Sequence, residues 1–495
     1  MADISVINRE QIERTPTHGV ALDCLTAGIA AAVPEQIVTE RVSITDGTLC
    51  VDAVDGETAT YDLEEYETIR LVGAGKAAGA MAAAVATRLG DRLTGGAVVT
   101  TDPGDETAAA ASTQRPVDVL AGDHPLPSER GVESTQRVVD VAQSAGADDL
   151  VVAVVTGGGS ALLAAPVDHV SVDEFRALTD ELLACGASID EINAVRKHCS
   201  AVKGGQLARG AAPATVLTLA VSDVVGDDVG VIASGPTAPD PSTYADALAV
   251  CDRYDLDLPA AIREHLRAGV AGDRPETPTA TDPVFERTRT LVVGNGRTAL
   301  DAAASAAADR GYAPLVLAAG MRGEARETAL AHVAIAEECV ETGSPASPSC
   351  VLLSGGETTV TLGDAVPDAS GAAATHGSGR GGPNGEFAAS AGVALEHEGV
   401  VVASVDTDGI DGTSGASGGI VDAATLDSDA ARDALGRHDV APLLASADAL
   451  VRTGATGTNV NDLRAVVVEG DRPDDVDGGD EHDGDGRENG DAGRG

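Results

Sequence analysis

The chain has 495 residues, and its 79 acidic against 33 basic side chains give a formal net charge of −46. A surface this acidic repels a phosphate backbone, which argues against nucleic-acid binding, and it is typical of proteins that stay soluble in concentrated salt. Hydrophobic residues make up 43% of the chain and aromatic residues only 2%, so we expect two or more domains with aliphatic cores.

The sequence indicates neither a membrane span nor a secretion signal. It contains no apolar run of about 18 residues and no basic-then-apolar leader. Its seven cysteines are scattered and never spaced as Cys-x-x-Cys, which argues against a disulfide framework or a zinc cluster. We therefore expect a cytoplasmic protein with reduced cysteines and no membrane partner. A homo-oligomer is compatible with the sequence, which does not define the oligomeric state.

The first half of the chain has the pattern of an α/β domain, which we predict over residues 1–267. Ala-rich stretches long enough for crossover helices, such as residues 132–145, separate short apolar segments. Ser188 and Glu191 predict a capping box at the start of a further helix. Buried parallel strands, each followed by a Gly- or Ser-bearing turn, are expected at residues 68–72, 97–100, 150–155 and 215–221.

A second α/β domain is expected over residues 286–468, after a polar, Pro- and Thr-rich linker at 268–285. Residues 365–385 are rich in Gly and Ala and predict a mobile loop, which is a candidate lid. Residues 469–495 predict a disordered acidic tail, because so few apolar residues cannot build a core. The expected strands of this domain lie at residues 290–293, 314–317, 350–353 and 400–405.

Lysine is rare, with three residues against thirty arginines, so each lysine is a candidate for a specific role. Lys76 lies in the run Gly-Ala-Gly-Lys-Ala-Ala at 73–78, between a predicted strand and a predicted helix. There the free N–H groups and the helix dipole favour an anion, and a compact ammonium can reach a phosphate oxygen. The run is not a Walker A loop, and the alternative interpretation is a glycine turn needed only for close packing.

A second glycine turn, Gly157–Gly159 followed by Ser160, comes after the strand at 150–155. Consecutive glycines allow close approach to a ligand and can form an anion-binding nest, with simple flexibility as the alternative. Arg196 and Lys203 would lie on one face of the next helix, two turns apart, if the helix extends that far. Lys197 would point elsewhere, and we expect it to be a solvated charge.

Acidic residues follow strands in both predicted domains. Asp223 comes after the strand at 215–221, where it suits a base or a Mg²⁺ ligand. Asp406, Asp408 and Asp411 come after the strand at 400–405 with a spacing similar to a calcium loop, but Glu is missing at the twelfth position. A role with Mg²⁺ and nucleotide, or with substrate, fits better. In so acidic a chain, the alternative for each residue is a solvated surface carboxylate.

Nine ordered motifs between about residues 18 and 466 resemble the class II glycerate 2-kinase family. In the first half these are residues 73–78, Gly-Asp-His-Pro-Leu-Pro at 122–127, Gly-Gly-Gly-Ser-Ala-Leu at 157–162, Asn-Ala-Val-Arg-Lys-His at 193–198, and Ser-Asp-Val-Val-Gly-Asp-Asp at 222–228. Residues 354–360, 381–387, 406–412 and 456–462 resemble the family's C-terminal MOFRL-type domain, at about 350–466.

The resemblance implies a Rossmann-like α/β/α N-terminal domain, a smaller α/β C-terminal domain and an interdomain cleft. It implies ATP-dependent phosphorylation of D-glycerate at the 2-hydroxyl with Mg²⁺, and it makes Lys76 the leading catalytic residue. Arg380 is the candidate to supply a charge that some relatives carry at the position of Pro383. With the side chains argued above, the candidate site comprises Lys76, Asp223 and Arg196 for catalysis; Gly73, Gly75, Gly157, Gly158, Gly159, Ser160, Lys203, Arg380 and Asn384 for substrate and phosphate; and Asp406, Asp408 and Asp411 for metal.

Two alternatives remain open from the sequence. A hydroxypyruvate reductase using NAD(P)H would place its dinucleotide at Gly294–Ala299, but the acid expected about 20 residues further on is missing. We interpret that turn as the start of a helix or part of the cleft. A non-catalytic module that senses sugar phosphates would explain the glycine turns, but not the acids at the strand ends of both domains.

Overall fold

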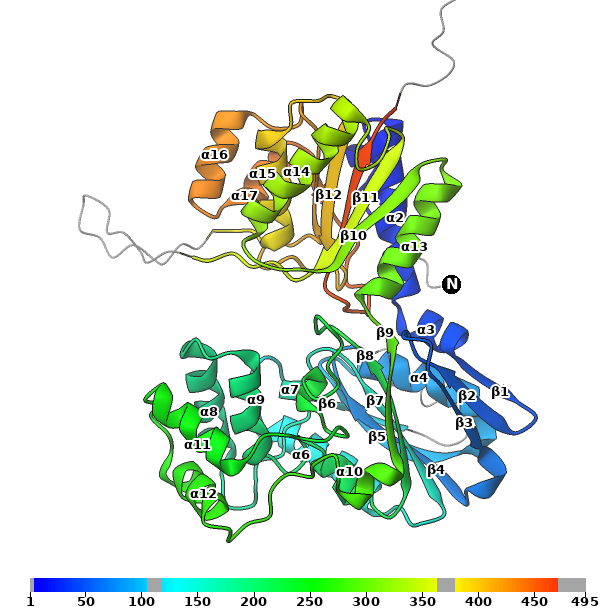
Figure 1. The fold of residues 1–495 in the computed structure, drawn as a ribbon, viewed down its shortest axis with the longest axis vertical. Helices are drawn as coiled ribbons and strands as arrows, with labels where there is room; N and C mark the ends of the chain where they lie inside the picture. The colour runs from blue at the N-terminus through cyan, green and yellow to red at the C-terminus, as the bar shows by residue number, and fades with distance from the viewer. Residues whose placement is uncertain (1–3, 105–116, 363–378, 471–495) are drawn as a thin grey trace, which may run out of the picture.

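The computed structural model describes residues 4–104, 117–362 and 379–470. Figure 1 shows two α/β units, one above the other, joined at a narrow waist. Each unit is built on a six-stranded sheet. Most of the expected lid at 365–385 and nearly all of the expected acidic tail at 469–495 lie outside the described residues.

The sheet of the first unit is entirely parallel and has the order β6-β5-β4-β7-β8-β9. This is the strand order of a Rossmann fold, which binds ligands at the carboxyl edge where the order reverses. That point lies between β4 and β7, so the turns after these two strands are neighbours. The four strands predicted in this unit are confirmed. The six strands are β4 (Thr68–Ala74), β5 (Leu93–Thr100), β6 (Val117–Ala121), β7 (Asp149–Val155), β8 (Thr215–Val221) and β9 (Thr288–Gly294).

Helices cover the first sheet, and the capping box of Ser188 and Glu191 is confirmed at the start of α9. A small antiparallel sheet of β1 (Val42–Thr45), β2 (Thr48–Asp52) and β3 (Thr58–Asp62) was not expected. The helices of this unit are α3 (Pro34–Arg41), α4 (Ala78–Leu89), α6 (Glu129–Gln143), α7 (Gly159–Leu162), α8 (Val172–Ala184), α9 (Ile189–His198), α10 (Gln206–Ala211), α11 (Tyr244–Arg253) and α12 (Ala260–Val270).

The second unit has a mixed sheet of order β10-β11-β15-β12-β13-β14. Its β15 lies between β11 and β12 and is antiparallel to both. The strands are β10 (Ala313–Met321), β11 (Cys350–Gly356), β12 (Val400–Asp406), β13 (Gly418–Val421), β14 (Leu450–Val451) and β15 (Asp462–Val468). The helices are α1 (Arg9–Ile12), α2 (Pro16–Ala31), α13 (Gly296–Asp309), α14 (Ala325–Thr342), α15 (Pro383–Ala394), α16 (Ser428–Gly436) and α17 (Val440–Ser446).

The structure corrects the predicted domain boundaries at both ends. The strand expected at 290–293 in the second domain is β9, which completes the first sheet. Helix α2 packs on α13 and β15 of the second unit, so closely that a Cβ on Gly28 would lie 2.5 Å from the Leu463 side chain. The predicted linker at 268–285 instead packs on the first unit, where Glu276 accepts hydrogen bonds from His198 and the Tyr244 backbone.

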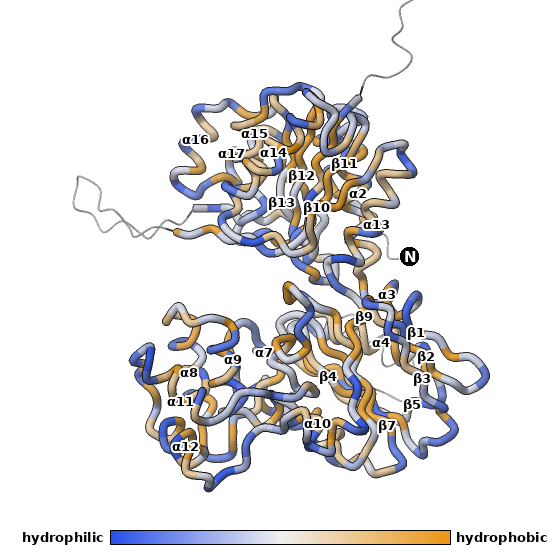
Figure 2. Tube along the Cα trace, in the orientation of Figure 1, coloured by the Kyte–Doolittle hydropathy of each residue, from blue (hydrophilic) through white to orange (hydrophobic). Residues whose placement is uncertain are grey.

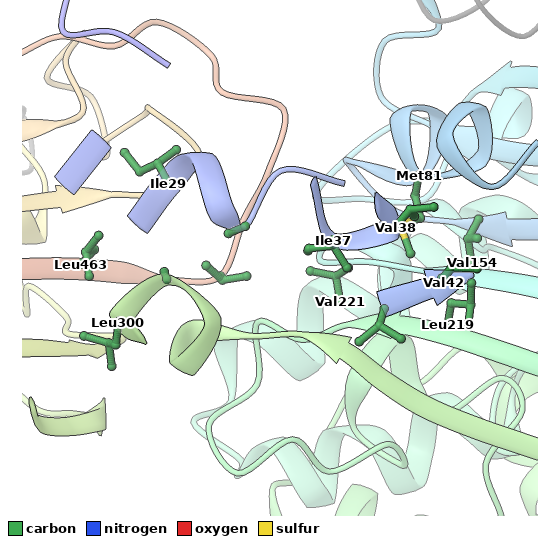
Figure 3. Packing of buried hydrophobic residues seen from close by; sticks show 14 of the residues in the cluster. Ile29, Ile37, Val38, Val42, Met81, Val154, Leu219, Val221, Leu300 and Leu463 are labelled. Atoms are coloured by element: carbon green, nitrogen blue, oxygen red, sulfur yellow. The ribbon is translucent and has the colours of Figure 1, made fainter. Parts of the chain in front are cut away.

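The chain therefore crosses between the units twice, after α2 and after β9. Figure 3 shows Ile29 of α2 on the side of Leu300 and Leu463, and Ile37 of α3 on the side of Val221. These side chains belong to one buried apolar cluster that extends through both units. Figure 2 shows the same apolar character along the strands of both sheets. Because the two units share this packing at both crossings, the position of one sheet edge relative to the other is fixed.

A helix needs about 20 mostly apolar residues to cross a bilayer, which sets a limit for the helices of the described residues. No single one of them is long and apolar enough to span a membrane, and α2 with α3 passes that test only as a pair bent by 66°.

Candidate active site

The turns after β4 and β7 are joined at the reversal point of the first sheet. The Lys76 backbone N–H donates to the Gly157 carbonyl at 2.8 Å, and the Thr100 hydroxyl donates to the Lys76 carbonyl at 2.9 Å. Gly75 has a φ of +147°, and a Cβ there would lie 2.1 Å from the Thr156 hydroxyl oxygen. The glycine is therefore required by close packing, and the turn fixes the backbone from which the Lys76 side chain projects.

Gly157, Gly158 and Gly159 form a floor among functional side chains, which we call the glycine cradle. A Cβ on Gly157 would lie 2.5 Å from an Asp223 carboxylate oxygen. A Cβ on Gly158 would lie 3.0 Å from Lys76 Cγ and 3.2 Å from the His124 ring. The structure thus brings together Lys76, Asp223 and His124 around a surface that only glycine can form, so the glycines are not simply flexible.

Asp223 follows β8 at the same sheet edge and reaches the second unit through its carbonyl, which accepts a 2.6 Å hydrogen bond from the Asn461 amide. Burial raises the pKa of its carboxyl, while Lys76 and the Gly158 N–H act in the opposite direction. A carboxyl shifted toward neutrality can accept a proton more readily at physiological pH, which suits a general base.

The second unit presents acids to Lys76. Its ammonium lies 3.5 Å from the Asp408 carboxylate, so an ion pair joins the two units. Burial, together with the neighbouring Asp408, raises the pKa of Asp406 to about 8. Partial burial raises the pKa of Glu357 as well, with the charges of Asp223 and Asp462 adding to the effect. Acids from both units therefore face one lysine.

This arrangement fits Mg²⁺ bound with phosphate better than a metal held by protein alone. Within the described residues, no group of three or more His, Cys, Asp or Glu side chains is arranged to hold a metal. Mg²⁺ usually takes one or two carboxylates and completes its shell with water and phosphate oxygens. Asp408 with Asp406 suits that role. Asp411 is engaged elsewhere, because its carboxylate accepts the Asn384 and Gly385 N–H groups at 2.9 Å and caps α15.

The other two lysines are buried. Lys197 is 6% exposed and pairs with Asp240 at 3.3 Å, so its interpretation as a solvated charge was wrong. Helix α9 ends at His198, so Lys203 does not continue the helical face of Arg196 as predicted. Lys203 instead lies beneath α7 and donates to the Ser160 and Leu163 carbonyls at 2.7 and 3.0 Å. It supports the segment that follows the glycine cradle.

Lys203 should leave a signature in the pH dependence of stability. Burial, aided by the nearby Arg196, lowers its pKa from 10.5 to about 7. The unfolded state therefore binds the proton more tightly, and this contribution makes the fold more stable as pH rises from about 7 to 10.5. Relative to Lys203→Met, the free energy of unfolding of the wild type should increase by up to about 1.4 kcal/mol per pH unit. Urea titrations across this range provide the measurement, and a difference independent of pH would contradict the burial argument.

Asn384 and Arg380, both predicted to bind substrate or phosphate, have partners within the second unit. Asn384 is 1% exposed; its amide donates to Asp462 at 2.7 Å and accepts from the Ser404 hydroxyl at 2.5 Å. It lies at the start of α15 rather than in a loop. The Arg380 side chain is 68% exposed and lies 3.5 Å from Asp439. The structure therefore does not place either side chain around Lys76.

Sequence reasoning missed four residues near the site: His124, Asn193, Glu357 and Asn461. Each lies within or beside a motif that supported the family resemblance. Their residue types alone gave no signal, because an isolated His, Asn or Glu most often has a structural or solvated role. His124, Glu357 and Asn461 lie beside strand ends and Asn193 lies on α9, and these positions became visible only in the fold.

A Rossmann-ordered sheet edge with a glycine cradle, facing acids of a second α/β unit, defines a two-domain α/β protein with a candidate site for an anionic ligand where its units meet. Comparisons with known proteins agree. Residues 20–267 match a domain of unknown function, DUF4147, and residues 350–462 match the MOFRL family. The chain belongs to the class II glycerate kinase family.

Individual relatives cover most of the chain. D-glycerate 2-kinase of Thermotoga maritima is 36% identical over 406 residues, which is 80% of this chain and 90% of that protein. A protein of Agrobacterium vitis with the provisional name hydroxypyruvate reductase is 43% identical over 404 residues, covering 80% and 86%. A crystal structure of glycerate kinase from Thermotoga maritima aligns with a TM-score of 0.74 at 33% identity, over 91% of this chain and 99% of that one. These matches confirm the two-domain α/β fold.

Proposed function

We propose that this protein is a glycerate 2-kinase, which transfers the γ-phosphoryl group of ATP to the 2-hydroxyl of D-glycerate and requires Mg²⁺. The observation that carries the proposal is Lys76, which projects from the turn after β4, beside the glycine cradle, toward Asp408 of the other unit at 3.5 Å. Phosphoryl transfer needs mainly positioning and charge neutralisation. The glycerate kinases among the relatives support the same reaction. We further propose that the enzyme works in the cytoplasm.

In this proposal Lys76 binds the phosphoryl group during its transfer, while the glycine cradle lets the phosphate oxygens approach the backbone. A cation beside the developing charge stabilises the transition state without moving during the reaction. Asp408 and Asp406 would hold Mg²⁺, which supplies further charge neutralisation on the phosphates when bound. Asp408 and Lys76 form an ion pair with each other. Asp408 therefore lies where it can bind a cation such as Mg²⁺, and Lys76 lies where it can bind a phosphate oxygen.

Asp223 is the group that we assign to the 2-hydroxyl. It lies directly under Gly157 at the edge that holds Lys76, and burial raises the pKa of its carboxyl. A base near the acceptor can take the hydroxyl proton as the new P–O bond forms. The charge of the neighbouring Lys76 opposes this rise in the pKa of Asp223 and favours the ionised carboxylate that a base needs.

The hydroxypyruvate reductase alternative has the support of a relative's name but not of the structure around the proposed dinucleotide turn. The Asn295 side chain accepts the Arg297 and Thr298 N–H groups, and so caps α13 where a pyrophosphate would have to bind. The Asn295 amide also donates to Asp227 at 2.6 Å. The turn is therefore a helix start, as one of the two sequence interpretations stated.

A parallel assay of both activities separates the two functions. Purified protein in concentrated KCl would receive D-glycerate with ATP and Mg²⁺, or hydroxypyruvate with NADH or NADPH. We expect ADP release that depends on glycerate, and no nicotinamide oxidation. Nicotinamide oxidation without ADP formation would contradict the kinase proposal. Absence of both reactions, with the protein folded, would favour a non-catalytic binding role.

The net charge of −46 leads to a separate prediction about salt. Like charges on the surface repel one another, and added salt screens them over about 10 Å at 0.1 M and shorter distances at higher concentration. We expect the unfolding temperature and the kinase activity to rise together as KCl increases into the molar range. Thermal scans followed by circular dichroism provide the measurement. Full stability and activity in dilute buffer would contradict adaptation to salt.

A further inference from the structure

Arg196 is a partly buried cation that forms no ion pair among the described residues. It lies in the last turn of α9, in the half of the first unit that carries α7 (Figure 1). Burial alone lowers the pKa of its guanidinium; no acid opposes the effect. Among the described residues, none accepts a hydrogen bond or forms an ion pair with Arg196. The side chain is partly buried, and a guanidinium that loses part of its hydration is unfavourable unless an anion compensates it, so its surroundings indicate a ligand.

Asn193 lies three residues earlier, on the same face of α9. It too has a polar group without a partner among the described residues. Its side chain is 3% exposed. The side-chain carbonyl accepts a 2.8 Å hydrogen bond from the Ser234 hydroxyl, which fixes the amide orientation. The Asn193 amide nitrogen is then buried and has no hydrogen-bond partner in the described part of the chain. A buried donor without a partner costs about 1–3 kcal/mol, so it too indicates an absent acceptor.

The surrounding backbone connects this pair to the glycine cradle. Ser234 contacts the Ser160 hydroxyl at 2.9 Å, and Ser160 directly follows the cradle. Ala233 and Ser234 have φ angles of 50° and 62°, which residues with side chains seldom adopt. A Cβ on Gly159 would lie 2.7 Å from Ala233 Cβ, so this strained turn packs directly against the cradle. Strain of this kind is common where a protein positions a ligand.

We propose that Arg196 and Asn193 form a carboxylate subsite, which binds the acid group of a 2-hydroxy acid and places its hydroxyl beside the glycine cradle. This assignment rests on the proposed function for the identity of the acid. A guanidinium and an amide N–H offer planar donors that match the two oxygens of a carboxylate. Lys76, as a point charge beside glycine backbone, suits a phosphoryl group instead. The protein would thereby select acids over neutral polyols such as glycerol.

The test is calorimetric binding of D-glycerate, glycerol and ATP to the full-length protein. Variants would be Arg196→Met, Arg196→Lys and Asn193→Leu, each checked for folding by circular dichroism. Loss of one charge-assisted hydrogen-bonding group should weaken D-glycerate binding by about 10–100-fold in Arg196→Met and by about 5–10-fold in Asn193→Leu. Arg196→Lys should recover only part of the affinity, because it keeps the charge but loses the planar donors. Glycerol should bind no form detectably.

ATP affinity distinguishes a carboxylate subsite from a phosphate subsite. It should change less than about threefold in all three variants, a difference below 1 kcal/mol. A matched control is Arg209→Met on α10, because Arg209 pairs with Asp282 and takes no part in the proposed site. Loss of ATP binding with D-glycerate binding intact would overturn the proposal and assign Arg196 to phosphate. Unchanged D-glycerate binding in Arg196→Met would overturn it too.

The subsite can also be tested independently of catalysis. Glycolate and lactate carry the carboxylate and the 2-hydroxyl, and the wild type should bind them even if it fails to phosphorylate D-glycerate. Such binding, weakened in Arg196→Met, would support the subsite while the kinase proposal fails. Kinase activity on D-glycerate with an unchanged KM in Arg196→Met would contradict the subsite while the kinase proposal stands.

Discussion

Replacing Lys76 by alanine is expected to reduce kcat for phosphoryl transfer by about a thousandfold, or about 4 kcal/mol of transition-state stabilisation. The side chain projects from a turn fixed by hydrogen bonds to the β7 turn, and it is the cation that lies against both the glycine cradle and Asp408. Steady-state kinetics at saturating D-glycerate and ATP provide the measurement.

Two variants make this result specific to position and chemistry. Lys76→Arg keeps the charge but changes its shape and reach, and we expect it to retain a small part of kcat. Arg137→Ala removes an exposed cation that pairs with Asp118 on the outer face of the first unit, and its activity should match the wild type. If Lys76→Ala keeps more than about a tenth of the wild-type kcat, the transition-state role of Lys76 is contradicted.

The largest effect on stability is expected from Asp462→Leu, which should lower the free energy of unfolding of the second unit by about 3–5 kcal/mol. Asp462 accepts a hydrogen bond from Arg464, whose side chain is fully buried on β15 and lies over the Phe387 ring at 4.9 Å. Two other nitrogens of Arg464 already lack hydrogen-bond partners among the described residues. Removing Asp462 would take away the carboxylate that pairs with this buried charge and leave it a hydrogen bond to the Thr358 hydroxyl.

The double variant Asp462→Leu/Arg464→Leu tests that explanation, because it removes both charges. It should recover a large part of the lost stability, since apolar replacement of a buried ion pair is often neutral. Asp429→Ala is the control: its side chain is 98% exposed, so the pair with Arg432 should contribute less than about 1 kcal/mol. Urea unfolding at constant KCl, followed by circular dichroism, measures all three. A double variant as unstable as Asp462→Leu would contradict the uncompensated-charge account.

Strands β4, β5, β7 and β8 of the first sheet could be predicted because each is a short apolar segment followed by a glycine or serine turn, whereas β6 was not expected. β15 was missed because its sequence contains Asp462 and Arg464, and a buried ion pair does not look like a central strand. The predicted domain boundaries differed from those in the structure for another reason. The apolar pattern of β9 and α2 shows that they are buried but not against which unit, since that is decided by tertiary packing.

At the site, Lys76 and the glycine cradle could be predicted because a rare lysine and consecutive glycines, each directly after a buried strand, are typical of turns that bind anions. Lys197 and Lys203 share that rarity but serve buried contacts, which depend on where α9 ends. Asn193 shows the other limit. Its free amide is defined by Ser234, 41 residues further along the chain, and no local pattern could indicate that contact.

The position of the phosphate in the product tests the central claim most directly. Wild-type protein incubated with D-glycerate, ATP and Mg²⁺ in concentrated KCl would be followed by ³¹P NMR, with authentic 2- and 3-phosphoglycerate as standards. We predict 2-phosphoglycerate, formed in proportion to ADP. Formation of 3-phosphoglycerate, or ADP release without a phosphorylated acid, would contradict a site that holds the carboxylate at Arg196 and presents the 2-hydroxyl to Asp223 and Lys76.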